Sequence, residues 1–263
     1  MSASARDAYL AFAIELSERA GETILPHFRP AAIDIENKVR EGYDPVTQAD
    51  RAAEQAMRHR IAEQFPDHGV LGEEFGFLEG AGLTWVLDPI DGTRAFVMGL
   101  LHWGTLVALF DGQRPRIGVL RQPFSRETFA GDCEHASRSC DGAKRRLVTR
   151  RCASLEEALC ASTSPEMFSS AEESARFSHV QGLVRDMRYG TDCYAYAMLA
   201  AGHIDLIIEA SLQPYDVQAL IPIVEGAGGV LTTWEGENAS MGGAIVASGD
   251  PKLHEQVLKE LQS

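Results

Sequence analysis

The sequence predicts a mixed α and β protein, and two kinds of pattern indicate this fold class. Apolar residues recur at helical spacing through Ala5–His27, which is typical of an amphipathic helix. Short runs of β-branched and aromatic residues bounded by turn residues indicate strands, most clearly at Thr84–Leu87 and Ile204–Glu209. The length of 263 residues fits one large domain or two closely packed halves.

The first part of the chain is expected to contain two helices and a meander of strands. The first helix begins at Ser4 in a capping-box-like pattern and ends near Pro26. A strand over Ile33–Val39 and a turn over Arg40–Asp44 lead to a second helix, whose N-cap is Thr47. Strands are then expected at Val70–Leu71, Thr84–Leu87, His102–Phe110, Arg116–Leu120 and Glu127–Ala130, with a surface loop at Phe75–Gly82.

A polar, arginine-rich segment at Gly131–Arg151 is interpreted as a solvated face or linker. We therefore expect an N-terminal half over residues 1–145 and a C-terminal half over residues 146–263, packed as one compact unit. The second half alternates helix and strand. Its expected helices begin at Pro165, Tyr194, Pro214 (with a bend at Pro222) and Pro251, and its strands are Met187–Tyr189, Ile204–Glu209, Val230–Thr232 and Ala244–Ser248.

Two motifs that resemble ligand sites have simpler interpretations. Gly226–Gly229, G-A-G-G, follows a helix instead of preceding one, which favours a C-cap turn over a nucleotide loop. Cys133, His135 and Cys140 could be taken for a zinc cluster, but a fourth ligand at a usual spacing is missing. A solvated hairpin is the preferred interpretation of that segment.

The charge balance restricts the classes of partner. The net charge is −14, from 24 basic and 38 acidic residues, which argues against a nucleic-acid-binding face and against binding to an anionic membrane. An anionic small-molecule substrate remains compatible, because bound metal ions can reverse the local sign. The N-terminus lacks the pattern of a signal peptide, and the apolar runs are too short for a transmembrane helix.

The cysteines indicate a reducing compartment. The five cysteines are odd in number and contain no C-x-x-C pair, so a disulfide framework is not expected. Together with the lack of a signal peptide, this favours the cytoplasm as the location.

The stretch Trp85–Phe96, WVLDPIDGTRAF, carries the chemistry. A buried strand ends in two carboxylates, Asp88 and Asp91, with the carbonyl of Ile90 between them. Oxygen ligands of this kind suit a hard cation such as Mg²⁺. Thr93 is expected to be the N-cap of a short helix, and a helix N-terminus suits a phosphate. Metal-assisted hydrolysis of a phosphate ester requires a metal ion next to the phosphate. The pattern D-x-x-D alone would indicate only turn and cap residues.

The full string D-P-I-D-G-T resembles the signature of the inositol monophosphatase-like family of Mg²⁺-dependent phosphatases, and further family features recur from Asp44 to Gly229. The resemblance implies a layered α-β-α-β-α sandwich with the metal ions between its two halves. It also implies a homodimer, which is frequent in the family.

The resemblance implies a metal cage made only of oxygen ligands. Glu73 of G-E-E, Asp88, Asp91, the carbonyl of Ile90 and Asp216 would hold two or three Mg²⁺ ions, for which Mn²⁺ could substitute. Glu74 is the weaker candidate of the G-E-E pair. A solvated loop for Glu73 and an acidic first-turn residue for Asp216 are the structural alternatives. The sequence departs from the family pattern in one extra residue at E-G-A-G-G and in Tyr215, where tryptophan is commoner.

Water activation is also assigned by resemblance. Asp50 of V-T-x-x-D and Thr93 would orient or deprotonate the attacking water, with Glu73 acting beside the metals. Gly92, Thr93 and Arg94 would face the phosphate together with Asp216. Because G-x-S-x-G is absent and the cysteines lack an evident basic partner, direct attack by water is expected. The alternative for Asp50 is an acid at N3 of the second helix.

The substrate is indicated by the second half. The strings GTDCYAYAMLAAGHIDLIIE and DPIDGTRAF most resemble the histidinol-phosphate phosphatase branch, and inositol phosphatases tend to have small residues where Asp192 lies. Asp192 and Glu209 would face the leaving group, although an N-cap for Asp192 and a strand-end residue bonded to Arg94 or a backbone amide for Glu209 are structural alternatives. Inositol monophosphate, nucleotide 3′-phosphates and fructose 1,6-bisphosphate are rival substrates. Two alternatives belong to other functional classes: a catalytically silent sensor of a phosphorylated metabolite, and a protein in which the carboxylates form a structural Ca²⁺ site.

Overall fold

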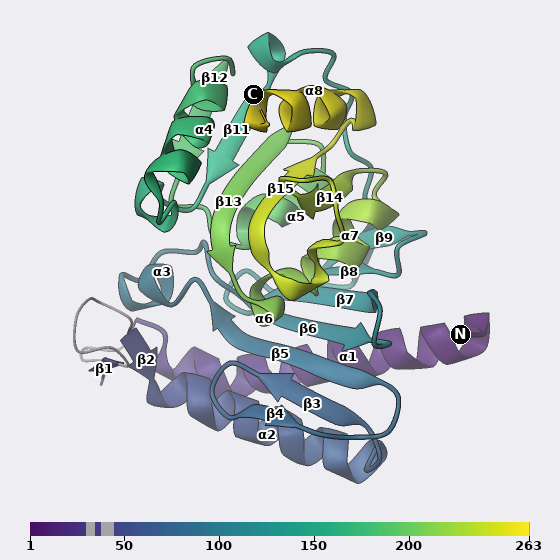
Figure 1. Cartoon of the computed structure of the whole chain (residues 1–263). Coiled ribbons are helices and arrows are strands. Elements are labelled where there is room, and N and C mark those ends of the chain that lie inside the picture. The colour runs from purple at the N-terminus through teal and green to yellow at the C-terminus, as the bar shows by residue number, and fades with distance from the viewer. Residues whose placement is uncertain (30–34, 38–44, 263) are drawn as a thin grey trace.

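The fold is a stack of alternating helical and sheet layers (Figure 1). The computed structural model describes residues 1–29, 35–37 and 45–262. Within these residues lie an eight-stranded sheet, a five-stranded sheet and a two-stranded ribbon. Helices cover the outer face of each large sheet and also lie between the two sheets, so the predicted α-β-α-β-α sandwich is confirmed.

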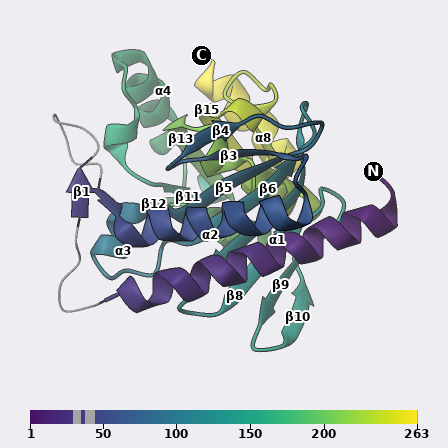
Figure 2. The same ribbon diagram turned by 90° about the horizontal axis from the view of Figure 1, so that it is seen from below.

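The first helical layer is made of α1 (Ala3–Ile24) and α2 (Gln48–Gln64), which lie side by side beneath the larger sheet (Figure 2). Their buried residues join Trp85 in one core. The N-cap of α1 is Ser2, whose hydroxyl accepts the N–H of Ala5 at 3.2 Å. The prediction of Ser4 as the cap is wrong, because Ser4 is the second residue of the helix and Ser2 already accepts the amide of the third.

A short ribbon connects the two helices. It pairs β1 (Ile35–Asn37) with β2 (Pro45–Thr47) in antiparallel fashion. The strand predicted over Ile33–Val39 is described only for β1, and the turn predicted over Arg40–Asp44 lies outside the described residues. The side chain of Thr47 is likewise not described, so its capping role stays a prediction.

The larger sheet has the order β10-β9-β8-β7-β6-β5-β3-β4. Only β3 and β5 are parallel neighbours in it, and the other pairs are antiparallel. Its strands are β3 (Gly69–Gly72), β4 (Gly76–Leu78), β5 (Thr84–Asp91), β6 (Gly104–Phe110), β7 (Pro115–Gln122), β8 (Glu127–Gly131), β9 (Ala136–Cys140) and β10 (Ala143–Arg146).

One segment of this sheet was predicted wrongly and another only in part. The loop expected over Phe75–Gly82 contains β4, because Gly76 at φ +67° reverses the chain onto β3. The segment Gly131–Arg151, interpreted as a solvated face or linker with a solvated hairpin around its cysteines, contains the hairpin of β9 and β10. Both are short edge or near-edge strands, and all four residues of β10 are exposed. Such strands lack the buried apolar face by which a strand is recognised in a sequence.

Both faces of the larger sheet are covered. On β6, Leu106 and Ala108 point toward the central layer, whereas Val107 and Leu109 point toward the core of α1 and α2. The central layer consists of α5 (Tyr194–Ala200) and α7 (Leu220–Gly226). The residues of α5 and α7 share one core with residues of both sheets, so the two halves are fused through it.

The helix expected from Pro214 to Glu225 is two helices, α6 (Pro214–Val217) and α7. The break falls at Gln218, four residues before Pro222, where the proline ring clashes with a helical carbonyl. Two glycines then let the chain approach the larger sheet. A Cβ on Gly118 would lie 2.0 Å from the carbonyl oxygen of Ala219, and one on Gly131 would lie 2.3 Å from that of Pro222.

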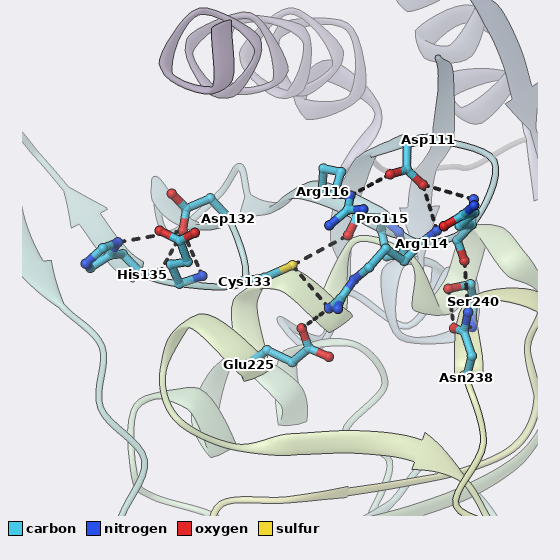
Figure 3. Close-up of polar contacts among 12 residues, drawn as sticks. Asp111, Arg114, Pro115, Arg116, Asp132, Cys133, His135, Glu225, Asn238 and Ser240 are labelled. Carbon is cyan, nitrogen blue, oxygen red and sulfur yellow. Dashed lines mark hydrogen bonds and ion pairs between the residues drawn. The ribbon is translucent and has the colours of Figure 1, made fainter. Parts of the chain in front are cut away.

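Arg114 ties the far end of α7 to the larger sheet (Figure 3). Its guanidinium pairs with Glu225 and donates to Sγ of Cys133 at 3.6 Å. Sγ of Cys133 is also 3.5 Å from the carbonyl oxygen of Pro115. Among the described residues, the clusters of side chains that could hold a metal ion consist of carboxylates and contain no cysteine. This supports a hairpin over a zinc site for the segment with Cys133. Gly226–Gly229 forms the expected C-terminal turn, with Gly228 at φ +100°.

The smaller sheet has the order β12-β11-β13-β15-β14. Parallel pairs join β11 to β12 and β13, and antiparallel pairs join β15 to β13 and β14. Its elements are β11 (Leu159–Ser162), β12 (Asp186–Tyr189), β13 (Leu206–Leu212), β14 (Val230–Thr233) and β15 (Gly243–Ser248), covered by α4 (Ala171–Gln181) and α8 (Pro251–Leu261). Asp250 caps α8 as predicted, because its Oδ1 accepts the N–H of Lys252 at 2.9 Å.

Short elements complete the chain: α3 (Thr93–Val97) and the 3-10 turns Leu25–His27, Leu155–Glu157, Pro165–Met167 and Ala239–Met241. In the part of the chain that the structure describes, none of the helices has the length and apolar character needed to span a membrane.

Candidate active site

The parallel strands β3 and β5 deliver carboxylates to one edge of the larger sheet. Gly72 lies opposite Leu87 in the ladder, and the N–H of Glu73 donates to the carbonyl oxygen of Leu87 at 3.3 Å. Glu73, the first residue after β3, therefore lies beside Asp88 of β5. β5 runs farther than predicted, through Asp91, but its ladder with β6 is irregular between Asp88 and Asp91.

Gly92 begins α3 at a position that requires glycine. Its φ is +82°, and a Cβ there would lie 2.8 Å from the carbonyl oxygen of His102 and 3.2 Å from Cβ of Asp192. Gly92 is itself the N-cap, so the prediction of Thr93 as the cap is wrong. The Thr93 hydroxyl instead donates to the carbonyl oxygen of Ile90 at 3.1 Å. That carbonyl retains a second lone pair for another partner.

Two groups of carboxylates could each hold a metal ion. Oxygens of Asp88, Asp91 and Asp216 lie within 4.8 Å of one another. The same limit holds for a second group made of Asp50, Glu73 and Glu74. Asp216 comes from α6, so the first group joins the two halves of the chain. Glu74, the weaker candidate from the sequence, lies with the other predicted acids.

The electrostatics of these groups favour bound cations. Burial, reinforced by Glu73 and Asp91, raises the pKa of Asp88 well above its usual value. Burial and then Asp216 raise the pKa of Asp91 to about 7, and burial likewise raises the pKa of Asp216 to about 7. The buried Oδ1 of Asp88 has no hydrogen-bond partner among the described residues. A divalent cation would satisfy that oxygen and offset the repulsion, and an all-oxygen donor set fits Mg²⁺.

Asp216 also has the structural role that the sequence offered as an alternative. Its Oδ2 accepts the N–H of Gln213 at 2.6 Å, and the Gln213 side chain completes a capping box. Capping leaves Oδ1 available, because a carboxylate can accept several bonds. Capping and metal binding are therefore compatible in this residue.

Glu54 is a site residue that sequence reasoning missed. It is fully buried in α2, and its carboxylate accepts the N–H groups of Glu74 at 2.7 Å and Phe75 at 3.3 Å. Arg58 donates to it from the next turn at 2.7 Å. A Cβ on Gly72 would lie 2.0 Å from Glu54 Oε1, so the glycine of G-E-E makes room for this carboxylate. The sequence did contain a signal for a buried role of Glu54, because this acid lies next to Ala53 on the apolar side of α2.

Asp50 and Thr93 enter the site from different elements. Asp50 is 1% exposed in the first turn of α2, as predicted, and belongs to the group with Glu73 and Glu74. Thr93 is the first residue of α3. Their joint role in holding a water stays a prediction.

A cavity of about 120 Å³ lies beside the carboxylate group of Asp88, Asp91 and Asp216. It is lined by Asp91, Asp192, Cys193, Glu209 and Asp216, with Thr163, Met167, Tyr196, Leu212 and Leu220. The predicted substrate residues Asp192 and Glu209 are therefore in one cavity with two of the predicted metal ligands.

Glu209 is held by three hydrogen bonds. Its Oε1 accepts the N–H of Thr163 at 2.9 Å and the Thr163 hydroxyl at 2.6 Å, and its Oε2 accepts the Tyr196 hydroxyl at 2.7 Å. The expected backbone-amide partner is thus Thr163. Glu209 lies inside β13 and not at its end, but the ladder with β15 becomes irregular directly after it.

Asp192 does not cap α5. Cys193 is the N-cap, without a side-chain bond, so the capping interpretation of Asp192 is wrong. Asp192 has φ +41°, a left-handed conformation that only a few residue types tolerate. Burial and then the charge of Asp91 raise the pKa of its carboxyl to about 8, whereas Arg94 opposes this shift.

A model of the inositol monophosphatase family matches residues 5–263. The chain belongs to the inositol monophosphatase family. The chloroplastic bifunctional phosphatase IMPL2 of Arabidopsis thaliana is 40% identical, over 97% of this chain and 75% of that protein. The histidinol-phosphatase of Mycobacterium tuberculosis is 35% identical, over 97% of this chain and 98% of that protein. The structure of an inositol monophosphatase from Zymomonas mobilis is 39% identical, covers 100% of both chains and has a TM-score of 0.87.

Membership in the inositol monophosphatase family makes this protein a phosphoric monoester hydrolase, and its phosphatase homologues act on small phosphate esters. The family is metal-dependent, and the two carboxylate groups of this chain could bind the metal.

Proposed function

We propose that this protein hydrolyses L-histidinol phosphate to L-histidinol and phosphate, a step of histidine biosynthesis. The observation that carries the proposal is the cavity in which Asp192 and Glu209 lie beside Asp91 and Asp216. The leaving group of histidinol phosphate has an ammonium and an imidazole. Carboxylates are the acceptors that bind such groups most strongly, because charge-assisted hydrogen bonds are stronger than neutral ones. The similarity to the histidinol-phosphatase of Mycobacterium tuberculosis supports the same substrate.

The metal ligands are proposed to be Glu73, Asp88, Asp91, Asp216 and the carbonyl of Ile90. Two or three Mg²⁺ ions, or Mn²⁺ in their place, would polarise the ester phosphate and lower the pKa of a water molecule. The two carboxylate groups support more than one ion, since each group is compact enough to hold one.

The protein groups beside the ions have distinct proposed roles. Asp50 and Thr93 hold and deprotonate the attacking water, and Glu73 keeps it in place. Gly92, Thr93 and Arg94 face the phosphate. The exposed Arg94 guanidinium would complement phosphate charge, and its influence on the pKa of Asp192 supports a position near the cavity.

The electrostatics of Asp192 support a cationic leaving group. Its pKa of about 8 means that, without a cation beside it, this carboxyl is mostly protonated at neutral pH. An ammonium group bound at hydrogen-bond distance would favour the ionised form and draw the pKa down. A neutral polyol would not provide this stabilisation.

Inositol monophosphate is the second candidate substrate. The observation in its favour is the similarity over the full length to an inositol monophosphatase from Zymomonas mobilis. The hydroxyl groups of inositol could also donate to Glu209. The two substrates differ in charge, so Asp192 is the residue that should discriminate between them.

Phosphate release from a panel of esters tests the proposal. The panel contains histidinol phosphate, inositol 1-phosphate, a nucleotide 3′-phosphate and fructose 1,6-bisphosphate, each with Mg²⁺ and with excess chelator. We expect the highest kcat/KM for histidinol phosphate and loss of activity with chelator. A higher kcat/KM for inositol 1-phosphate would overturn the substrate assignment, and full activity in chelator would overturn the metal mechanism.

We also propose a homodimer, and an exposed apolar surface supports it. Met98 is 71% exposed and Phe124 48% exposed, with Leu100 and Leu101 exposed between α3 and β6. Arg29 brings the two segments together, since it donates to the carbonyl oxygen of Gly99 at 2.9 Å and lies over the ring of Phe124. Single exposed apolar residues are ordinary, but a group that lies together is typical of an interaction surface. Light scattering should give twice the chain mass, and Met98→Glu should shift the protein to monomer; a wild type that is monomeric at all concentrations contradicts the dimer.

Two further expectations remain proposals. Residues 1–145 and 146–263 are proposed as the two halves of one compact unit, supported by the change of sheet between β10 and β11 and by the shared central core. A cytoplasmic location is proposed, supported by the five free cysteines.

A further inference from the structure

Helix α5 brings a tyrosine hydroxyl into the cavity from the central core. Tyr196 is 1% exposed, its ring packs among apolar residues of both sheets, and its hydroxyl donates to Oε2 of Glu209 at 2.7 Å. We propose that Tyr196 is a positioning residue for leaving-group recognition: together with Thr163 it fixes the Glu209 carboxylate so that one oxygen lone pair faces the leaving group. The proposal rests on the proposed function, since it concerns the same cavity.

The count of acceptor positions supports this role. A carboxylate offers about four lone-pair positions, two on each oxygen. Thr163 uses both positions of Oε1, through its N–H and its hydroxyl, and Tyr196 uses one position of Oε2. One position on Oε2 is left for a ligand. Without the Tyr196 bond, only the two Thr163 bonds at Oε1 would restrain the last torsion of the side chain, and the direction of that position would be less well defined.

The charge of Glu209 depends on the same bonds. The side chain is 2% exposed, and burial alone favours the neutral acid. Hydrogen bonds from Thr163 and Tyr196 oppose that effect, because they are made to the ionised carboxylate. Losing one donor would therefore weaken both the orientation and the negative charge that a cationic leaving group requires.

The position of Tyr196 is fixed independently of Glu209. Three residues earlier in the chain, the N–H of Cys193 donates to Oδ2 of Asp91 at 2.9 Å, which anchors the start of α5 at the DPIDGT stretch. The helix that carries Tyr196 is thus held at its start by a predicted metal ligand, and the ring of Tyr196 is held by the central core. A rigid donor of this kind can orient its acceptor.

Tyr194 provides a matched control on the same helix. Its hydroxyl donates to Oε2 of Glu127 at 2.6 Å, the same type of bond to the same type of residue. Glu127 lies on β8 and pairs with Arg138 of the β9 strand, and neither Tyr194 nor Glu127 lines the cavity. Tyr194→Phe therefore removes an equivalent hydroxyl without touching the leaving-group region.

The experiment compares Tyr196→Phe with Tyr194→Phe in the full chain with Mg²⁺. The first measurement is the ratio of kcat/KM for histidinol phosphate to that for p-nitrophenyl phosphate, whose leaving group lacks a cation. The second is the inhibition constant of histidinol against p-nitrophenyl phosphate hydrolysis. We expect Tyr196→Phe to lower the ratio and raise the inhibition constant by about tenfold each, the loss typical of a hydrogen bond to a charged group. Tyr194→Phe should leave both values within about twofold of wild type, the range that corresponds to a few tenths of a kcal/mol.

Thr163 gives a second test that does not depend on the folding of Tyr196→Phe. Thr163→Val removes one hydroxyl donor to Glu209, whereas Thr163→Ser keeps it. We expect Thr163→Val to lower the same ratio and Thr163→Ser to keep it close to the wild-type value. An unchanged ratio in both Tyr196→Phe and Thr163→Val overturns the positioning role, and so does an equal loss in Tyr194→Phe.

Failure of the substrate assignment is separable from failure of the positioning role. If wild type does not hydrolyse histidinol phosphate, the proposed function is wrong. The ratio is then measured with the ester that wild type prefers, and its alcohol replaces histidinol as inhibitor. A loss specific to Tyr196→Phe supports the positioning role for that ester, and no loss overturns it.

Discussion

The backbone N–H of Cys193 donates to Oδ2 of Asp91 at 2.9 Å, across 102 positions of the chain. This bond joins the turn that precedes α5 to the end of β5. Because Asp192 directly precedes Cys193, the bond also brings Asp192 against Gly92. A Cβ added to Gly92 would lie 3.2 Å from Cβ of Asp192. The residues predicted to bind metal and those predicted to bind the leaving group are therefore aligned by one contact.

Asp91→Asn tests the metal cage. Asparagine keeps an oxygen that can accept the Cys193 N–H, so we expect the fold to be kept, and above about pH 7 the thermal midpoint without metal should rise because a buried, repelled charge is removed. Removing one negative charge from the group with Asp88 and Asp216 should weaken Mg²⁺ binding and lower turnover by orders of magnitude. Isothermal titration with Mg²⁺ and phosphate release measure the two effects. Wild-type values for both would leave Asp91 as a turn residue only.

Asp50→Asn separates water activation from helix stabilisation. Loss of an acid in the first turn of α2 should lower the free energy of unfolding by about 0.3–1 kcal/mol, and relief of repulsion with Glu73 and Glu74 should offset part of this. Turnover should nevertheless collapse, because asparagine cannot take a proton from water. Urea unfolding and kcat are measured on the same preparations. If kcat matched wild type, the helix-dipole role would account for Asp50 fully.

The stability of the metal-free protein should depend on pH through the same carboxyls. The pKa values of Asp91 and Asp216 are raised to about 7 in the folded protein, above their usual value of 3.8. The folded state therefore binds more protons than the unfolded state between about pH 4 and 7, and the stabilisation present below pH 4 is lost as the pH rises through 7. Mg²⁺ should raise the thermal midpoint more at pH 8 than at pH 5, and its binding at pH 6.5 should release protons. A shift of the midpoint that is independent of pH would contradict this assignment.

His254 should have the opposite effect on acid stability. It is 4% exposed between α8 and the smaller sheet, where its ring nitrogens contact the hydroxyls of Ser248 and Thr232, and burial lowers its pKa to about 4. The unfolded state binds the proton first, so stability present above pH 6.5 is lost as the pH falls to about 4, by up to about 3 kcal/mol. The difference in unfolding free energy between wild type and His254→Gln should change with pH only inside this window.

The sequence was sufficient where function depends on spacing along the chain. The DPIDGT stretch, the G-E-E acids and Asp216 were predicted from local strings, and the structure brings their carboxylates together in two groups. The layered sandwich followed from the family resemblance and is confirmed. The buried helices and strands were recognised because their apolar residues repeat with the period of the element.

The sequence was insufficient where a contact joins distant segments. Glu54 and Gly72 are adjacent only because α2 crosses the end of β3. Tyr196 reaches Glu209 only because α5 packs against β13. The N-cap at Gly92 was missed because its left-handed backbone is set by the approach of His102 and Asp192. Only Glu54 leaves a local signal, as an acid on the buried side of α2, and the other contacts leave no periodic or local pattern.

Asp192→Asn tests the identity of the substrate. Asparagine keeps the shape of the side chain and tolerates the left-handed backbone at φ +41°, which alanine tolerates less well. The substitution removes a negative charge that a bound ammonium would favour, while the metal ligands are unchanged. We expect KM for histidinol phosphate to rise by roughly tenfold or more, as for the loss of a charged hydrogen bond of about 1.5–3 kcal/mol. KM for inositol 1-phosphate should change much less, because its leaving group is neutral. An equal rise for both esters would make Asp192 a structural residue of the turn that meets Gly92, and its carboxylate would then have no part in selecting the substrate.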